Sequence, residues 1–379
     1  MRREEQIRLI RAALAAIDGG EPPLAESWTE NRTDVYTSPE RAERERRALF
    51  AGRLPLVVGL SSQVREPGDF LSDDLSPVPV IVVRSAEGSL NAFANICRHR
   101  GSKLVSGCGQ AASRFICPYH AWSYDIEGRL RTIPDEEAFA GLDRDAHGLI
   151  ALPVEERHGL IWVTPTPGAG RRVEDLLGGL GADLASYAVD RFQLAETRRL
   201  SRKMNWKLAG DTFWEAYHLR VLHKATLGTL FARNVGLFDA FGACHRLVGI
   251  RSSIEKLRGR PESEWDLLPH ATILMSLFPN TILVMQTDHL EMYRVFPAAD
   301  RVDESVTEVS LLVSREDVAS RRPWEKTMEL LLGVIEEDFT NGEGIQRSFA
   351  TGLLPSVVYG RCEAALEHFH RSIRAAIGE

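Results

Sequence analysis

Residues 97–122 read CRHRGSKLVSGCGQAASRFICPYHAW and carry two cysteines and two histidines in two short pairs. The first pair is Cys97-x-His99 and the second is Cys117-x-x-His120, with 17 residues between them. Thiolates and imidazoles grouped in this way hold either a structural zinc ion or an iron–sulfur cluster. Gly and Pro beside the pairs indicate tight loops between strands. The stretch therefore predicts a β domain that holds a metal centre between two loops.

The composition of the pairs favours the cluster over zinc. Each pair offers one Cys and one His, so one iron can take both thiolates and the other both imidazoles. This is the ligand arrangement of a Rieske [2Fe–2S] centre, whose potential is raised to roughly −150 to +300 mV because neutral imidazoles replace thiolates. A two-Cys, two-His zinc site is the alternative. Cys108, which lies between the pairs, is interpreted as a loop thiol.

The whole-chain composition limits the class of protein. The 379 residues are 44% hydrophobic and 26% charged, which is ordinary for a globular protein. A net charge of −7 argues against a nucleic-acid partner. The N-terminus mixes acids with bases, unlike a signal peptide, and the apolar runs fall short of the ~20 residues of a membrane span. Five cysteines, an odd number, argue against a disulfide framework. We expect a cytoplasmic protein with no membrane contact.

Hydrophobic patterning divides the chain into three segments. Residues 1–45 are expected to be helical and to pack on the catalytic domain. Residues 46–165 alternate short apolar runs with turn signals, which predicts an all-β domain with hairpin turns at Ala86-Glu87-Gly88 and Ile126-Glu127-Gly128. Residues 166–379 contain successive strand patterns of an antiparallel sheet and two long helical patterns. The expected fold class is α+β.

A second group of metal-binding side chains occurs in NWKLAGDTFWEAYHLRVLH, residues 205–223, where we predict a helix. Glu215 and His218 are three residues apart and would share one face of it. His223 lies about 140° round a regular helix from His218, so the helix must end or distort if both bind one metal. Two His and one carboxylate form the facial triad of non-haem Fe(II) oxygenases. Two such His alone are more often packed than ligating, but the cluster motif upstream favours the metal.

Both motifs together resemble the catalytic α subunit of the Rieske non-haem iron oxygenases, the aromatic-ring-hydroxylating family. The resemblance rests on the Cys-x-His and Cys-x-x-His pairs, and on Asn205-Trp206-Lys207 followed by acid-x-x-His-x₄-His. It covers nearly the whole chain. It implies one Rieske [2Fe–2S] cluster and one Fe(II) per chain, and a catalytic domain of the helix-grip (START-like) fold.

The resemblance also implies roles for single residues. His218 and His223 are the expected iron ligands, and Asp338 in VIEEDFTNGEGIQ matches a third. Glu337 and Glu343 are weaker candidates for that position. Glu215 matches an acid that links the iron's His to a Rieske His of the neighbouring subunit, which implies a homotrimer with electron transfer between subunits. Asn205 is the other expected catalytic residue.

The electron source is expected to be another protein. The segment GGLGADL lacks a full dinucleotide-binding fingerprint and is interpreted as a turn between helices. The resemblance implies a separate NAD(P)H-dependent reductase, with or without a ferredoxin. Arg98, Arg100 and Lys103 beside the cluster are candidates for its docking patch, and hydrogen-bonded loop charges are the alternative interpretation.

The predicted substrate is an aromatic or other hydrophobic small molecule that reacts with O₂. Candidate substrate-binding residues are Thr212, Asn234, His245, Met285 and His289. Dioxygenation, monooxygenation and demethylation share the same iron site, so a monooxygenase or demethylase acting on methoxy-aromatic or quaternary ammonium compounds is an alternative. Some members of the family that act on quaternary ammonium compounds also carry Glu at the bridging position, where many ring-hydroxylating members carry Asp.

Two further alternatives remain. One is an electron-transfer Rieske protein without oxygenase activity. The other is a ligand-binding helix-grip protein with a zinc-stabilised β domain. Both leave the spacing of Glu215, His218 and His223 unexplained.

Overall fold

The computed structural model describes residues 1–379 except residues 21–22, 112, 169, 299–300 and 319–323 and the side chains of residues 233–234 and 318. The chain forms two compact units. The larger unit comprises Met1–Glu45, Leu176–Ala188 and Leu194–Glu379, and the smaller unit comprises Arg46–Asp175 and Val189–Gln193. Each unit is described separately below.

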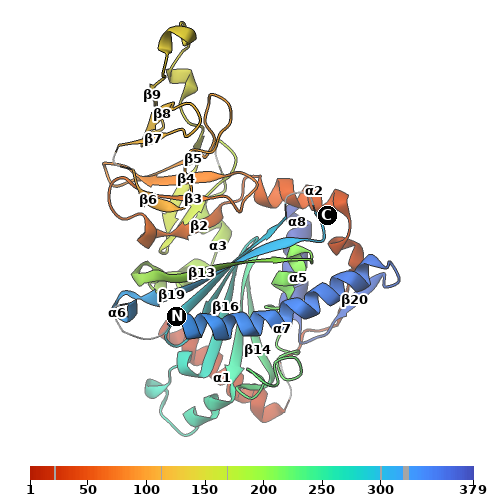
Figure 1. Ribbon diagram of the computed structural model, residues 1–379. Helices are drawn as coiled ribbons and strands as arrows, with labels where there is room; N and C mark the ends of the chain where they lie inside the picture. The colour runs from red at the N-terminus through yellow and green to blue at the C-terminus, as the bar shows by residue number, and fades with distance from the viewer. Residues whose placement is uncertain (21–22, 112, 169, 299–300, 319–323) are drawn as a thin grey trace. The chain divides into compact units, whose positions relative to one another are not determined.

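The smaller unit is built from antiparallel strands in three sheets, labelled in Figure 1. The sheet orders are β10-β5-β4-β3-β6, β11-β12-β2 and β7-β8-β9. The strands are β2 (Leu56–Leu60), β3 (Asp69–Asp73), β4 (Val80–Arg84), β5 (Leu90–Ala94), β6 (Cys108–Gln110), β7 (Arg114–Ile116), β8 (Ser123–Asp125), β9 (Leu130–Thr132), β10 (Ala151–Leu152), β11 (Val154–Arg157) and β12 (Leu160–Val163). A π-helix (Arg46–Phe50) precedes them, and α3 (Val173–Leu177) follows.

Both predicted hairpin turns of this unit are confirmed. Gly88 lies between β4 and β5 with φ 84°, and Gly128 lies between β8 and β9 with φ 83°. Positive φ favours glycine because it has no Cβ. At Gly128 an added Cβ would come within 2.4 Å of the Phe93 ring, so this turn also needs glycine for space. The turn thereby brings β8 and β9 close to the core beneath the Cys/His loops.

The larger unit contains a seven-stranded sheet in the order β13-β19-β18-β17-β16-β15-β14, antiparallel from β19 to β14. Its strands are β13 (Phe192–Arg202), β14 (Phe231–Phe241), β15 (Cys244–Arg251), β16 (Ala271–Leu277), β17 (Thr281–Met285), β18 (Leu290–Pro297) and β19 (Ser305–Ser314). The helices are α1 (Arg3–Gly19), α2 (Pro39–Glu45), α4 (Leu180–Ser186), α5 (Trp206–Asp211), α6 (Arg315–Val318), α7 (Trp324–Ala350) and α8 (Ala364–Ala376), and β1 (Thr29–Arg32) pairs with β20 (Ser356–Tyr359). The antiparallel sheet with helices confirms the α+β class.

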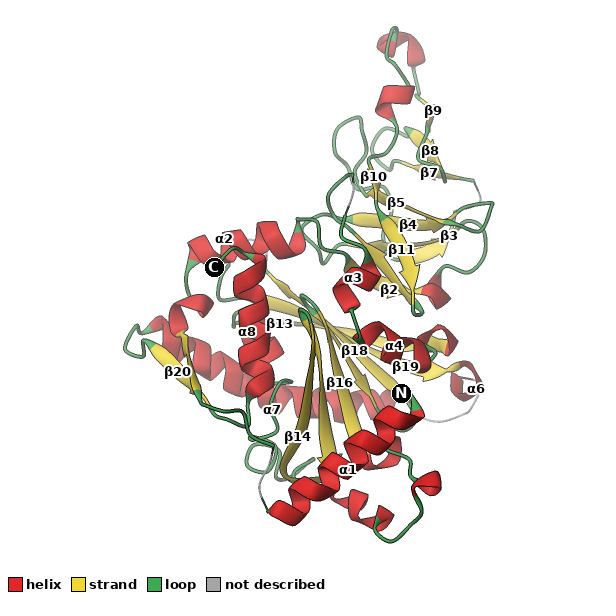
Figure 2. Ribbon diagram, turned by 180° about the vertical axis from the view of Figure 1, so that it is seen from behind, coloured by secondary structure: helices red, strands yellow, loops and turns green. Residues whose placement is uncertain are grey.

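Helices cover both faces of the large sheet. Figure 1 shows α7 in front of the strands, and the view from behind in Figure 2 brings α1 forward. The fully buried Arg246 of β15 points to the α1 side, where its guanidinium pairs with Glu5 and Asp183 and with Asp239 at 2.6 Å. Its neighbour His245 points to the other face and meets His368 of α8. The alternation of side chains along a strand thus separates a packed face from the face that α7 covers.

Helix α5 is held at its start by buried polar contacts. The Asn205 side chain caps the helix by accepting a hydrogen bond from the Lys207 backbone N–H at 3.0 Å. The buried Lys207 ammonium pairs with the Glu45 carboxylate at 2.6 Å, and the Trp206 indole donates to the same carboxylate. Capping and a paired buried charge together fix where the following residues leave the helix.

The predicted helix over residues 205–223 is wrong in its length, since α5 ends at Asp211 and turns follow to residue 230. The physical reason lies partly in the Asp211 carboxylate. It accepts hydrogen bonds from the buried Tyr36 hydroxyl at 2.7 Å and faces His370 at 2.9 Å. A continued helix would turn the two histidines apart, whereas the observed turns bring their rings to 5.0 Å between centroids.

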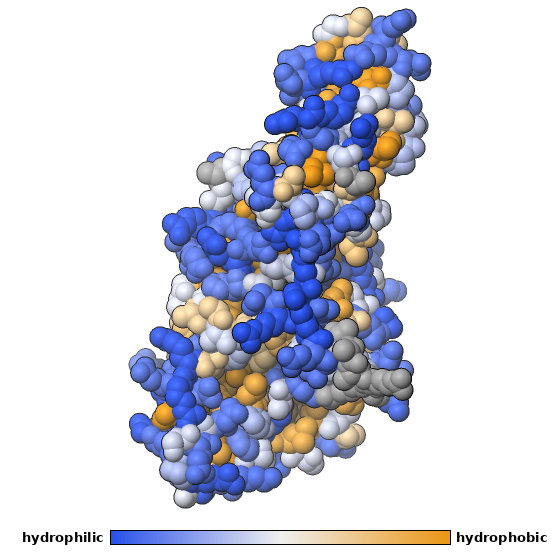
Figure 3. Space-filling model, turned by 90° about the vertical axis from the view of Figure 1, so that its left-hand side faces the viewer, coloured by the Kyte–Doolittle hydropathy of each residue, from blue (hydrophilic) through white to orange (hydrophobic). Residues whose placement is uncertain are grey.

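The surface of the chain is mixed in polarity. On the face shown in Figure 3, hydrophobic areas are scattered among hydrophilic residues. In the described part of the chain, every helix is too short or too polar to span a lipid bilayer.

Candidate functional site

The two Cys/His loops of the smaller unit share one backbone design. In the first loop, the Cys97 N–H donates to the Ser102 carbonyl at 2.8 Å, and the Gly101 N–H donates to the Cys97 carbonyl at 2.9 Å. In the second, Cys117 donates to the Trp122 carbonyl at 2.8 Å and Ala121 donates to the Cys117 carbonyl at 3.0 Å. In both loops the Cys N–H bonds the carbonyl five residues later, and the N–H four residues later bonds the Cys carbonyl. This pattern recurs although the spacing between Cys and His differs by one residue. The loops are therefore two copies of one ligand-presenting turn.

The fourth residue after each Cys adopts a left-handed conformation. Gly101 has φ 76° and Ala121 has φ 56°. Glycine takes this conformation freely, whereas alanine is strained by its Cβ. The second loop thus keeps a conformation that its sequence disfavours.

The four expected cluster ligands lie together at the ends of these loops. The side chains of Cys97 and Cys117 are buried in the core of the unit, and the His99 and His120 rings are 4.7 Å apart between centroids. The Trp122 indole stacks on His99 at 4.8 Å with an interplanar angle of 8°. The structure therefore brings the predicted set into one place, with thiols inside and imidazoles outside.

The donor set suits a [2Fe–2S] cluster. The His120 Nδ1 atom is enclosed and has no hydrogen-bond partner in the described part of the chain, which a metal bond would satisfy. Burial raises the pKa of the Cys97 thiol. Burial also opposes ionisation of Cys117, but hydrogen bonds from the Tyr119 backbone, the Cys97 thiol and the His120 backbone together outweigh it and lower the pKa. Thiolates are the form that binds iron.

A tyrosine hydroxyl contacts the sulfur atom of Cys97. The Tyr124 hydroxyl lies 3.4 Å from Cys97 Sγ and accepts a hydrogen bond from the Arg98 backbone N–H at 3.0 Å. Hydrogen bonds to cluster sulfurs are among the factors that set the potential, and the Tyr124 hydroxyl lies within hydrogen-bond distance of one expected sulfur ligand.

The candidate docking residues have local partners. The Arg98 guanidinium donates to the Gly148 carbonyl at 2.8 Å, Lys103 pairs with Asp74 at 2.8 Å, and Arg100 lies over the Tyr119 ring. These contacts favour the interpretation as hydrogen-bonded loop charges, although Arg100 is exposed.

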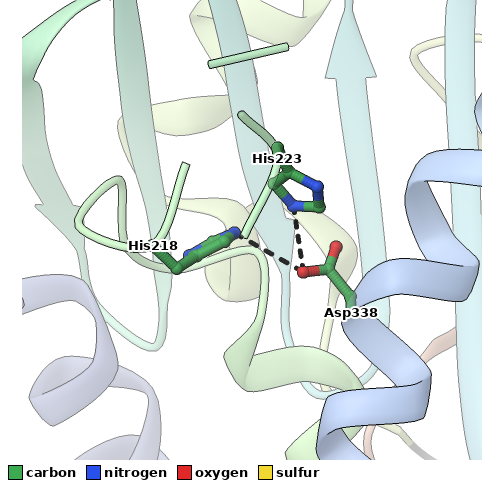
Figure 4. A group of neighbouring side chains, drawn as sticks. All are labelled: His218, His223 and Asp338. Atoms are coloured by element: carbon green, nitrogen blue, oxygen red, sulfur yellow. Dashed lines mark hydrogen bonds and ion pairs between the residues drawn. The ribbon is translucent and has the colours of Figure 1, made fainter. Parts of the chain in front are cut away.

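The expected mononuclear iron ligands converge in the larger unit. One ligand atom from each of His218, His223 and Asp338 lies within 4.8 Å of the others. Figure 4 shows both imidazoles directed at one carboxylate oxygen, Asp338 Oδ1, which is 3.5 Å from His218 Nε2 and 3.1 Å from His223 Nε2. The histidines come from the turns after α5, and the aspartate comes from α7. This is the two-His, one-carboxylate donor set that suits Fe(II) and leaves coordination positions open.

A second carboxylate holds each histidine from behind. Glu215 pairs with His218 Nδ1, and Glu337 faces His223 Nδ1 at 2.6 Å while accepting from the Thr226 hydroxyl at 3.1 Å. Burial opposes protonation of His223, but Asp338 and Glu337 outweigh it and raise its pKa. Carboxylates in this position fix the ring orientation and direct Nε2 to the metal.

Tight turns follow each of the two histidines, and in the first the His218 carbonyl accepts the backbone N–H groups of Val221 and Leu222 at 2.9 Å. The carbonyl of His223 accepts three backbone N–H groups, from Thr226, Leu227 and Gly228 at 2.8–3.0 Å. A Cβ on Gly228 would come within 3.1 Å of the His223 carbonyl oxygen, so this close approach needs glycine. These turns bring the His218 and His223 rings to 5.0 Å between centroids.

A cavity of about 310 Å³ opens beside the three ligands. Its wall on the α7 side comes from one helix face, including Leu331, Val334 and Ile335. Its floor is the large sheet, where Leu247, Gly249 and Arg251 of β15 point to the same side. The lining also holds Thr212, Phe213, Phe231, Thr272, Leu274, Val284, Gln286, His289, Glu291 and Tyr293. A mainly apolar cavity with a few polar groups is typical of a small-molecule site.

Only some of the predicted substrate-binding residues line the cavity. Thr212 and His289 line the cavity. Met285 is buried on the opposite face of β17 from Val284, because side chains alternate along a strand. His245 lies on the cavity side of the sheet, but Trp214 covers it at 4.2 Å between ring centroids. The side chain of Asn234 lies outside the described residues.

Asn205, expected to be catalytic, is not among the cavity-lining residues of the described chain. Its amide caps α5 and donates to the Val302 carbonyl at 2.7 Å. It supports the helix that precedes the site.

Sequence reasoning overlooked two charged residues of the cavity lining. Arg251 and Glu291 line the cavity, and Gln286, another lining residue, contacts both. The available signal was the alternation of HRLVGIR in β15, which puts one arginine on the same face as two small or apolar residues. Glu337 was weighed only as an iron ligand, and its position behind His223 was not predicted.

Two family descriptions match the chain. "Ring hydroxylating alpha subunit (catalytic domain)" matches residues 189–379, and "Rieske [2Fe-2S] domain" matches residues 55–150. The chain is 32% identical over 197 residues to the glycine betaine monooxygenase oxygenase subunit of Chromohalobacter salexigens, covering 52% of this chain and 43% of that protein. It is 32% identical over 200 residues to the carnitine monooxygenase oxygenase subunit of Escherichia coli K12, covering 52% and 53%. The chain spans about half the length of the curated relatives it matches.

Solved structures share the fold. A quaternary ammonium Rieske monooxygenase in complex with L-carnitine superposes with a TM-score of 0.78 at 21% identity, covering 94% of this chain and 96% of that one. Naphthalene 1,2-dioxygenase from Rhodococcus sp., bound to indole, gives a TM-score of 0.76 at 20% identity and covers 99% of both chains. At these identities the likeness concerns the fold.

Proposed function

Because the chain belongs to the ring-hydroxylating α-subunit family and carries a Rieske [2Fe–2S] domain, we propose that it is the terminal oxygenase component of a Rieske oxygenase. It takes electrons from a separate NAD(P)H-dependent reductase, directly or through a ferredoxin, and uses O₂ to hydroxylate an apolar small molecule. The observation that carries this proposal is the His218, His223 and Asp338 group facing a mainly apolar cavity. The rival electron-transfer interpretation gives this group and its cavity no task.

The residues have distinct tasks in this proposal. Cys97, His99, Cys117 and His120 hold the cluster, and His218, His223 and Asp338 hold the Fe(II). When bound, the cluster supplies single electrons and the Fe(II) activates O₂. Glu215 and Glu337 keep Nδ1 of each ligand histidine protonated, so that Nε2 is the free donor atom. Leu331 and Val334 on α7 add apolar wall to the cavity beside these ligands.

We further propose that Glu215 bridges two subunits of a homotrimer. Its carboxylate already contacts His218 Nδ1 and accepts the His218 backbone N–H at 3.0 Å. A carboxylate has capacity for further donors, and an imidazole N–H of a neighbouring subunit's cluster is the donor that the family resemblance implies. Mass photometry of the purified protein tests the trimer.

A second candidate is monooxygenation or demethylation of a quaternary ammonium compound. It is supported by the curated relatives, which include glycine betaine and carnitine monooxygenase oxygenase subunits. Glu215 at the bridging position agrees with it. Aromatic rings that could face an alkylammonium group, Phe213, Phe231 and Tyr293, are present in the cavity lining.

The deciding experiment is a single turnover with labelled oxygen. The anaerobically purified, chemically reduced protein is exposed once to ¹⁸O₂ with aromatic acids, methoxy-aromatics, polycyclic hydrocarbons and quaternary amines, and products are read by mass spectrometry. Two labelled oxygens in a product indicate dioxygenation, and one, or release of formaldehyde, indicates monooxygenation or demethylation. A fully iron-loaded protein that yields no labelled product with any class contradicts the proposed oxygenase activity.

A further inference from the structure

Arg251 is a cationic residue on the wall of a mainly apolar cavity. It is the last residue of β15 and shares the cavity-facing side of that strand with Leu247 and Gly249. Gly249 allows the Phe231 ring to pack against the strand, since an added Cβ would come within 3.2 Å of that ring. The cavity is continuous from Arg251 to the His218, His223 and Asp338 group.

The Arg251 guanidinium is held by neutral groups. Its Nη2 donates to Gln286 Oε1 at 2.7 Å and to Thr272 Oγ1 at 3.2 Å, and its Nη1 donates to Thr287 Oγ1 at 3.5 Å. In the described part of the chain, no carboxylate forms an ion pair with it. An arginine has five N–H donors, so Nε and part of Nη1 remain available. These atoms are not among the enclosed polar atoms without partners in the described part of the chain.

The nearby acidic group is already occupied. The Glu291 carboxylate accepts from the Tyr293 hydroxyl at 2.6 Å and from Gln286 Nε2 at 2.9 Å, and His289 Nε2 lies 3.4 Å away. Gln286 therefore stands between the two charges, accepting from Arg251 and donating to Glu291. This arrangement fixes the orientation of the amide and keeps the guanidinium apart from Glu291.

Arg251 is partly buried, and burial lowers its pKa, although the nearby charges of Asp288 and Glu291 act in the opposite direction. A guanidinium that has lost part of its hydration and keeps free N–H donors gains from a charged acceptor that bonds them directly. The planar guanidinium matches a carboxylate, which can accept two parallel N–H donors. The remaining lining offers apolar and aromatic side chains for the rest of a ligand.

We propose that Arg251 is a specificity-determining residue that binds the carboxylate of an organic-acid substrate. The acid's apolar body lies along Leu247, Leu274 and Val284 and brings the reacting carbon to the iron ligands. This inference rests on the proposed function, and it deepens it by naming the chemical class of the substrate. A neutral hydrocarbon would offer no acceptor to the free N–H donors of Arg251 and would bind less tightly.

The test is calorimetric titration of the iron-loaded, oxidised protein under anaerobic conditions. Benzoate, 4-methoxybenzoate, cyclohexanecarboxylate and γ-butyrobetaine are each compared with the corresponding amide, which has nearly the same shape but no negative charge. The comparison is repeated in R251Q and in R251K. R258Q is the matched control, because Arg258 pairs with Asp18 at 2.7 Å and is not among the cavity-lining residues.

We expect at least one acid to bind the wild-type protein more tightly than its amide. R251Q should weaken that acid roughly 10- to 100-fold, the cost of losing charge-assisted hydrogen bonds, while the amide changes little. R251K should fall between, since an ammonium keeps the charge but not the paired donors. A merely structural role for Arg251 would weaken acid and amide alike. If R251Q does not fold, R251K alone must lower the preference for the acid.

Two results overturn the proposal. One is a wild-type protein in which no acid binds more tightly than its amide. The other is an acid preference that R251Q and R251K retain in full. Because the readout is binding, it is independent of turnover. Arg251-dependent acid binding without any ¹⁸O-labelled product would uphold this inference and contradict the proposed oxygenase function. Labelled product from neutral compounds alone would support the oxygenase function and contradict this inference.

Discussion

The two metal-binding regions of this chain place their ligands in different ways. In the smaller unit, Cys97 with His99 and Cys117 with His120 sit on two turns with the same hydrogen-bond pattern. In the larger unit, His223 and Asp338 are 115 residues apart, and turns without a regular helix carry both histidines. The first site depends on local backbone geometry. The second depends on how α7 packs over the sheet.

This difference teaches where each site is vulnerable. The Cys/His site of the smaller unit is specified by two short stretches of sequence, so backbone strain in one turn directly affects the positions of its ligands. The distributed site needs carboxylates behind its histidines, because the turns after α5 do not fix the ring orientations by themselves. The following predictions test whether the two metal-binding regions are independent of each other.

The strongest test of separateness is H223A. Removing one of two imidazole donors should abolish binding of the mononuclear iron and reduce product formation to background, while the visible spectrum of the Rieske cluster stays unchanged. Iron analysis, absorption and single-turnover product yield measure the three quantities. Loss of the cluster spectrum in a folded H223A protein would show that the two sites depend on each other.

E215Q should retain both metal centres but lose activity. The amide keeps the shape and one hydrogen bond of the carboxylate but removes the charge that faces His218 Nδ1. We expect product formation to fall about 100-fold, the upper range for carboxylates behind metal-binding histidines. Iron content and the cluster spectrum serve as controls, and full coupled turnover would rule out the bridging role.

E337Q should have a smaller effect on the same site. Glu337 orients His223 alone, so we expect affinity for Fe(II) to fall about 10-fold, measured by competition with a chelator. The adjacent E336Q is the matched control, because Glu336 is exposed and pairs with Arg202. Equal effects of the two substitutions would mean that Glu337 does not orient the histidine.

The smallest expected effect concerns the cluster loops. G101A should destabilise the first loop by ~1 kcal/mol and A121G should stabilise the second by a similar amount, since both positions are left-handed. At Gly101 an added Cβ meets no atom within 4 Å, so only backbone strain is tested. The readout is the temperature at which the cluster absorption is lost. G141A is the control, a left-handed glycine outside the two loops.

Much of the fold could be predicted because local signals agreed with the final structure. Turn residues at Gly88 and Gly128 marked hairpins, and alternating apolar residues marked strands of the large sheet. The prediction of a helix through His223 was wrong because local helix propensity does not include the contacts of Asp211 with Tyr36 and His370. Those partners are distant in sequence, so no local pattern reports them.

The candidate sites show the same limit. The Cys/His pairs were visible as a motif because all four residues lie within 24 positions of each other. Asp338 required a family resemblance, since its proximity to His223 depends on the packing of α7. The orientation of Met285 away from the cavity follows from the strand register, which sequence alone did not fix. Arg251 was overlooked because the alternation in β15 groups it with Leu247 and Gly249 but does not report which face of the strand lines the cavity.

One helix, α7, carries both a proposed metal ligand and part of the cavity wall. Leu331, Val334 and Asp338 recur along one side of it. A single inserted or deleted residue before Asp338 would rotate that carboxylate by about 100°. Homologous chains should therefore tolerate substitutions at 331 and 334 but no change in the length of this segment. Diversification of substrate range in such enzymes has to proceed by exchanging side chains, with the spacing along α7 held constant.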